Sequence, residues 1–137
     1  MTRASAQPGG SLVLDSEALA RAVARDRNAT RWLALARADD LRVTTSAATL
    51  VEIIHPRINR PALEWTLSKI VVEPVSVRIA QHAAALLIGV GRHGHRHAID
   101  AMLCATALAS PPPVIVLTSD PDDLTVLCGT GATVMTL

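Results

Sequence analysis

Four carboxylates stand at positions in the sequence from which they could act together. Asp15 and Asp120 each follow an apolar run, Glu52 lies within an apolar helical segment, and Asp100 lies near the start of another. Gathering such groups costs repulsion and raises their pKa values. A hard divalent cation such as Mg²⁺, which prefers oxygen ligands, removes that cost. One or two such ions would activate water and stabilise an in-line displacement at phosphorus.

Three of these four carboxylates also have an ordinary structural explanation when each is taken alone. Asp100 would be favoured in the first turn of a helix by the helix dipole. Asp120, which precedes a proline, could be the N-cap of a short helix, and Asp122 and Asp123 could be its first-turn acids. Glu52 could mark the polar edge of its helix. The four together are harder to explain this way than any one of them.

The elements that position these acids are two uninterrupted apolar runs, at residues 11–14 and 113–119. Such runs are typical of strands covered on both faces in a parallel sheet. Ligands bind beyond the carboxyl ends of parallel strands, where Asp15 and Asp120 stand. Strands and helices alternate without repeats or an internal linker, which predicts a three-layer α/β/α fold with a central, mostly parallel sheet. We expect a single domain over residues 11–137, preceded by a disordered leader at residues 1–10.

Local patterns place the remaining elements. Ser16 is a plausible N-cap of the first helix, Thr45–Ser46 of the third, and Pro74 marks an edge strand or a strand end. Further strands are predicted at residues 41–44, 70–75 and 133–137. Helices are predicted at residues 17–27, 32–37, 47–54, 61–70, 76–90, 97–109 and 121–127, with an interruption near Asn28 and Thr30.

Composition limits the kinds of partner. Half of the 137 residues are hydrophobic, yet there is no Phe or Tyr and only two Trp, which argues against base-stacking platforms for single-stranded nucleic acid. The net charge is +1, but all 13 basic residues lie between Arg3 and Arg96, and Lys69 is the single lysine. The arginine excess could reflect codon bias, or it could form a basic surface around an acidic pocket.

The cysteines and the hydropathy pattern indicate a cytoplasmic protein that does not contact a membrane. Cys104 and Cys128 lack CxxC spacing, and Cys104 lies in an apolar helical pattern, which predicts a buried small hydrophobe in a reducing compartment. No apolar run is long enough to span a bilayer, and the N-terminus lacks the apolar segment of a signal peptide.

A histidine-rich segment at residues 92–97 allows two interpretations. His93, His95 and His97 could hold a transition metal, although their alternation does not match structural zinc spacing. A solvated loop that contacts substrate phosphate through Arg92 and Arg96 fits the segment better. The sequence contains no GxxxxGK[ST] motif, so Walker-type nucleotide hydrolysis is not supported.

Four motifs in chain order resemble those of PIN-domain ribonucleases, specifically the VapC-like toxins of bacterial type II toxin–antitoxin modules. They are Leu12-Val-Leu-Asp-Ser16, Ser46-Ala-Ala-Thr-Leu-Val-Glu52, His97-Ala-Ile-Asp-Ala101 and Val116-Leu-Thr-Ser-Asp-Pro-Asp-Asp-Leu124. Each motif alone is weak, but four in order at suitable separations are fairly specific. The resemblance covers nearly the whole chain from Leu12 onward.

The resemblance implies an acidic catalytic site with an Mg²⁺ or Mn²⁺ ion. Its catalytic residues would be Asp15, Glu52, Asp100 and Asp120. The metal would be held by Asp15, Asp100 and Asp120, and support would come from Ser16, Thr118 and Asp123. Asp120 and Asp123 are both candidates for the closer ligand of the last motif, and Asp120 is favoured.

The resemblance also implies an activity and partners. The chain would be a metal-dependent endoribonuclease toxin that hydrolyses RNA, forms homodimers and is neutralised by a small antitoxin occluding the acidic cleft. The helices at residues 17–37 and 61–70 could supply the dimer face, with Trp32 and Trp65 as anchors or as ordinary core residues. The alternative is a non-catalytic module that uses the acidic pocket to dock an ion or a partner. A receiver-type phosphoacceptor is a weaker version, because it would need a lysine near the last core strand.

Overall fold

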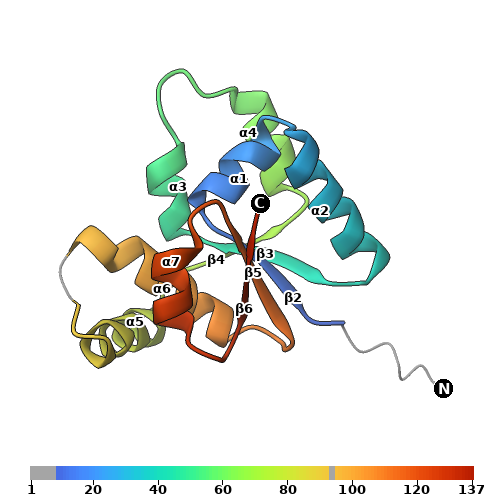
Figure 1. The fold of residues 1–137 in the computed structure, drawn as a ribbon. Helices are drawn as coiled ribbons and strands as arrows, with labels where there is room; N and C mark the ends of the chain where they lie inside the picture. Colours follow the sequence, from blue (N-terminus) through green and yellow to red (C-terminus); the bar gives the residue numbers. More distant parts are fainter. Residues whose placement is uncertain (1–8, 93–94) are drawn as a thin grey trace.

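A computed structural model describes residues 9–92 and 95–137 of the chain (Figure 1). Five strands form one parallel sheet with the spatial order β4-β3-β2-β5-β6, which confirms the predicted α/β class. The strands are β2 (Ser11–Leu14), β3 (Arg42–Ser46), β4 (Val71–Glu73), β5 (Val114–Thr118) and β6 (Thr133–Thr136).

Helices cover both faces of the sheet and complete the three layers (Figure 1). One face carries α1 (Ser16–Val23), α2 (Arg27–Ala38), α3 (Ala48–Ile53) and α4 (Arg60–Leu67). The other carries α5 (Val77–Gly89), α6 (Ala98–Leu108) and α7 (Pro121–Cys128), with the short 3₁₀ helix η1 (His95–His97) before α6. The sequence therefore alternates strand and helix, as a parallel sheet with crossover helices requires.

The central strands are apolar on both sides because each side meets a separate core. In β2, Leu12 and Leu14 pack with α1 to α4, whereas Val13 packs with α5 to α7. All three side chains are at most 1% exposed. Burial of each stabilises the fold by about 1.5–3 kcal/mol. This double coverage explains why β2 does not alternate apolar and polar residues.

The region between β2 and β3 differs from its prediction. The first helix ends at Val23 and the second begins at Arg27, so the predicted interruption near Asn28 and Thr30 is wrong. The chain turns instead at Arg25, which has a left-handed φ of 61°. Glycine usually marks such a conformation, and an arginine there gave no local signal. Asp26 then caps the second helix by accepting a hydrogen bond from the Ala29 backbone N–H at 3.1 Å.

The described fold begins before the predicted boundary at residue 11. Gly9 N donates to the Asp40 carbonyl at 3.1 Å, and the Gly10 carbonyl accepts from Arg42 N at 2.9 Å, so both residues belong to the domain rather than to the leader. Gly10 has φ 121°, and a Cβ there would lie 2.3 Å from the Pro113 carbonyl oxygen. Only glycine fits this position. Residues 1–8 of the predicted leader lie outside the described residues.

The structure also places the proline, cysteine and tryptophan residues that the sequence singled out. Pro74 follows β4, which is an edge strand. Cys104 is fully buried, and the Cys128 thiol lies 2.7 Å from its sulfur, between α6 and α7. Trp32 packs partly buried against the core, whereas Trp65 is 48% exposed. Within the described residues, no helix has both the length and the apolarity to cross a membrane.

Candidate acidic active site

The acidic residues predicted from sequence meet in one cleft at the carboxyl ends of the central strands. The cleft measures about 470 Å³ and opens where β2 and β5 lie side by side. Asp15 follows β2 directly, and Asp120 stands two residues after β5. The acids that line the cleft are Asp15, Glu17, Glu52, Asp100, Asp120 and Asp123. Ser16 and Thr118, predicted to support the site, line it as well.

Asp15 is held by the start of α1. Its Oδ1 accepts a hydrogen bond from the Ala18 backbone N–H at 2.7 Å, so Asp15 caps the helix and the prediction of Ser16 as the cap is wrong. The β-region backbone of Asp15 aims its carboxylate at the first helical turn, which leaves the Ser16 side chain free for another partner. Burial raises the pKa of Asp15, and its hydrogen bonds from the Thr118 hydroxyl and from Ala18 oppose that rise.

The Ser16 side chain forms a hydrogen bond with Glu52 instead of capping α1. The Ser16 hydroxyl donates to the Glu52 carboxylate, joining α1 to α3 across the mouth of the cleft. Helix α3 begins without the predicted Thr45–Ser46 N-cap, because Ala47 takes the cap position. Ser46 still contributes, since its Oγ accepts from Ala48 N at 3.1 Å, and the buried Thr45 hydroxyl donates to the Leu14 carbonyl at 2.7 Å. Glu52 itself is exposed to solvent.

Asp100, Asp123 and His97 form the tightest group in the cleft region. One ligand atom from each lies within 4.8 Å of the others. The pKa of Asp100 is raised to about 6, first by burial and then by the negative charges of Glu52, Asp123 and Asp15, and the nearby His97 opposes the rise. A carboxyl surrounded by like charges is the electrostatic situation that a bound cation relieves.

Asp120 lies apart from this tightest group, although it lines the same cleft. Asp120 occupies the N-cap position of α7, but its carboxylate makes no capping hydrogen bond there, so helix capping does not account for it. Its backbone N–H donates to the Thr118 hydroxyl at 3.0 Å. The buried Thr118 hydroxyl donates in turn to the Asp120 carbonyl at 3.2 Å, and its nearness to Asp15 lowers the pKa of that carboxyl. The structure thus brings Asp123, rather than Asp120, beside Asp100.

The two arginines predicted to contact substrate are placed differently. Arg92 follows α5 and forms an ion pair with Asp123, with 2.7 Å between Nη1 and Oδ1. The two side chains are 30% and 39% exposed, so the pair lies at the rim of the site. Arg96 is exposed in η1. His93, a member of the predicted histidine motif, lies outside the described residues.

Sequence reasoning missed the position of His97 in the site. It treated the three histidines as one alternating motif, whereas the structure places His97 alone with Asp100 and Asp123 among the described residues. A signal was present, because residues three apart share one face of a helix, and His97 precedes Asp100 by three positions. His55, which also lines the cleft, gave no comparable signal.

The donor set fits a hard divalent cation. Most of the available ligand atoms are carboxylate oxygens, which suit Mg²⁺ and Mn²⁺, and the imidazoles of His97 and His55 lie beside them. A structural zinc site would instead draw on cysteine or several histidines. Burial is the main cause of the raised pKa of Asp100, and the negative charges of the neighbouring acids add to it, so a cation among them would relieve part of this cost.

The structure thus combines an α/β/α domain with carboxylates clustered beyond the carboxyl ends of its central parallel strands, the edge at which such sheets bind ligands. Residues 12–124 match the family model of the PIN domain, and the chain therefore belongs to the PIN domain family. Members of this family are generally nucleases that use divalent metals. No curated protein matches the sequence.

Solved structures show the same fold. A chain of the crystal structure of VapBC2 from Rickettsia felis, bound to a DNA fragment from its promoter, superposes with a TM-score of 0.70 at 14% identity, covering 92% of this chain and 98% of that one. A chain of DNA-bound VapBC from Salmonella typhimurium gives a TM-score of 0.69 at 17% identity, covering 92% and 97%.

Proposed function

We propose that this chain is a divalent-metal-dependent endoribonuclease and the toxin of a toxin–antitoxin pair. The observation that carries the proposal is the convergence of Asp15, Glu52, Asp100 and Asp123 from four separate elements in one cleft. Mutual repulsion makes such a cluster of carboxylates unfavourable by itself, and a divalent cation bound among them offsets that repulsion. The resemblance of the four sequence motifs to VapC-like ribonucleases supports RNA as the substrate.

Within this proposal, Asp15, Asp100 and Asp123 hold the Mg²⁺ or Mn²⁺ ion, and Asp120 adds negative charge at the end of β5. The preference for Asp123 over Asp120 follows from its place beside Asp100. When bound, the ion supplies Lewis-acid activation of water and neutralises charge that develops on the phosphate.

The chain's own residues then have separate tasks. Glu52, oriented by the Ser16 hydroxyl, accepts a proton from the attacking water at the mouth of the cleft. Thr118 and the Ala18 N–H orient the Asp15 carboxylate. Arg92, which lies at the rim and pairs with Asp123, supplies a guanidinium for a substrate phosphate.

The proposed partners are an antitoxin and a second copy of the chain, in the cytoplasm. The two similar solved structures are both named as VapBC complexes, which supports an antitoxin partner, and the resemblance of the sequence motifs to VapC-like toxins implies that this partner covers the acidic cleft. For the homodimer, the most exposed aliphatic side chains are Val51 on α3 and Val77 and Ile88 on α5, at 79%, 74% and 74%. They make α3 and α5, which lie on opposite faces of the sheet, further candidates for a dimer face beside the two tryptophan-bearing helices.

The test is cleavage of total RNA by the purified protein with Mg²⁺ or Mn²⁺, with EDTA, and with the Asp100→Asn variant. We expect discrete fragments that require both the metal and Asp100. A folded protein that binds Mn²⁺ but cuts no RNA would contradict the proposal and favour a binding module that uses the acidic cleft for docking.

A further inference from the structure

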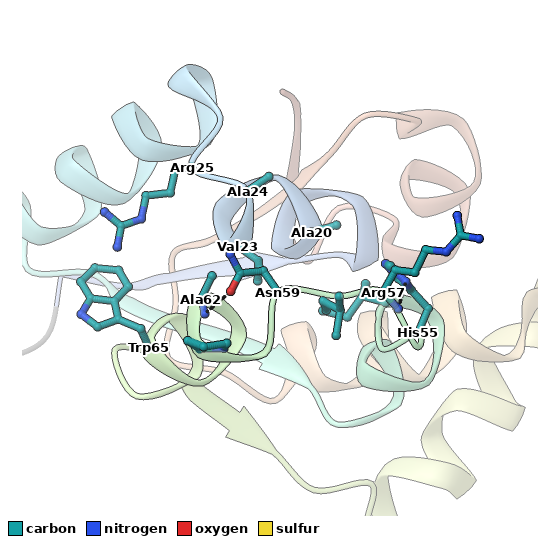
Figure 2. A pocket seen from close by; sticks show the side chains of 12 residues that line it. Ala20, Val23, Ala24, Arg25, His55, Arg57, Asn59, Ala62 and Trp65 are labelled. Atoms are coloured by element: carbon teal, nitrogen blue, oxygen red, sulfur yellow. Dashed lines mark hydrogen bonds between the residues drawn. The ribbon is translucent and has the colours of Figure 1, made fainter.

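A second hollow adjoins the acidic cleft and has the opposite chemical character. This groove measures about 610 Å³ and lies between the end of α1, the loop after α3, and α4 (Figure 2). Ala20, Ile53 and His55 line both hollows, so the groove and the cleft are continuous.

The charge of the groove is entirely basic among the residues that line it. Arg25, His55 and Arg57 supply potential cations, and none of the described lining residues is an acid. The neighbouring cleft, by contrast, is lined by six acids. A polyanion can follow the basic groove and enter the acidic cleft only where a divalent cation compensates the carboxylates.

An aromatic residue stands at one end of the groove. The Trp65 indole is 48% exposed, and the Arg25 guanidinium lies over it at 4.6 Å from the ring centroid. Figure 2 shows this pair facing each other at one end, with His55 and Arg57 at the other. The left-handed turn at Arg25 carries that side chain toward the groove. Both the indole and the guanidinium plane are surfaces on which unpaired nucleobases stack.

We propose that this groove binds the single-stranded RNA segment next to the phosphate that is cut. One base stacks on the Trp65–Arg25 pair, and Arg57 contacts the backbone between that base and the acidic cleft. The inference rests on the proposed ribonuclease function and specifies its substrate as unpaired RNA. With two tryptophans and no other aromatic in the chain, the contact reads one base rather than a continuous run.

Binding can be measured separately from cleavage. We would titrate the full-length Asp100→Asn variant, in buffer that contains Mg²⁺, with a single-stranded RNA dodecamer and follow tryptophan fluorescence. The chain has two tryptophans, Trp65 and Trp32, and no Tyr or Phe, and Trp65 is the more exposed of the two, so stacking should quench the signal. A duplex of the same sequence should quench little, because its bases are already stacked.

Variants locate the contact. In the same Asp100→Asn background, Trp65→Leu should weaken dodecamer binding by about 5- to 100-fold, and Trp65→Phe should restore part of the affinity. Arg57→Ala should lower the salt dependence of binding by about one ion. Arg78→Ala is the matched control, because Arg78 is exposed on α5, on the opposite face of the sheet, and should leave binding unchanged. Circular dichroism would confirm that each variant is folded.

The outcomes separate this inference from the proposed function. If the wild type cuts RNA but Trp65→Leu and Arg57→Ala bind the dodecamer as Arg78→Ala does, the groove inference fails and the ribonuclease stands. If an acidic peptide quenches Trp65 and the dodecamer does not, the groove is a protein-docking site and the inference also fails. Absence of both RNA binding and RNA cleavage would overturn the inference together with the function on which it rests.

Discussion

Replacing Asp100 with asparagine should stabilise the metal-free fold while abolishing activity. Asp100 is partly buried beside Glu52, Asp123 and Asp15, and these neighbours together with burial raise its pKa from 3.8 to about 6. A carboxyl whose pKa is higher in the folded state than in the unfolded state destabilises the fold when it is ionised. Asparagine has nearly the same shape and carries no charge, so the variant removes that penalty.

The magnitude follows from the shift in the pKa of Asp100. At 1.36 kcal/mol per pKa unit, a rise of roughly two units corresponds to at most about 3 kcal/mol. Solvent still reaches part of the site and screens the neighbouring charges, so we expect a gain of about 1–2 kcal/mol. For a domain of this size the gain corresponds to a rise in Tm of roughly 3–8 °C.

The stability gained by the Asp100→Asn variant depends on pH. Below pH 3.8 Asp100 is protonated in both folded and unfolded chains, so it carries no penalty. As the pH rises through about 6, the folded protein loses the stability that came from its tighter proton binding. The advantage of Asp100→Asn should therefore be full at pH 8 and should nearly vanish at pH 4.

Urea denaturation in EDTA measures the free energy of unfolding of the wild type and of the variant, once at pH 8 and once at pH 4. Adding Mn²⁺ at pH 8 should then reverse the order, because the cation stabilises the wild type by mass action and has lost a ligand in the variant. A variant that is less stable than wild type at pH 8 in EDTA, or equally stabilised at both pH values, would refute the electrostatic reasoning.

Three further predictions concern the same site. Mn²⁺ affinity, measured by calorimetry, should fall about tenfold per pH unit below pH 6 as Asp100 takes up a proton; affinity that stays constant from pH 7.5 to 5 would count against Asp100 as a ligand. Arg92→Ala should raise Mn²⁺ affinity about 2- to 5-fold, because it removes a cation that competes for Asp123, and should weaken RNA cleavage; lowered Mn²⁺ affinity would show that the ion pair organises the site. Ser16→Ala should reduce the cleavage rate about 3- to 30-fold with little change in Tm, because it frees the Glu52 carboxylate; an unchanged rate would remove Glu52 orientation from the mechanism.

Local patterns in the sequence were sufficient for the layers and for part of the site. The apolar runs that end at Asp15 and Asp120 predicted two strands covered on both faces, and the parallel arrangement then required their carboxyl ends to lie at one edge. The sequence also placed Glu52 and Asp100 on apolar helices, and the structure brings both residues to the same cleft. These features follow from periodicity and chain order.

Tertiary structure alone decided which side chains meet. Asp123 lies beside Asp100 because of how α7 packs against α6. It forms its ion pair with Arg92 because of where the chain leaves α5. The groove beside the cleft depends on Arg25, which has a left-handed backbone conformation in the turn between α1 and α2. Its guanidinium lies over the ring of Trp65, which belongs to α4. Sequence periodicity determines which face of a helix is buried, but the axial shift and rotation of packed helices depend on the detailed fit of many side chains. A shift of a few ångströms in that fit determines whether two charges form an ion pair, share a cation, or remain apart.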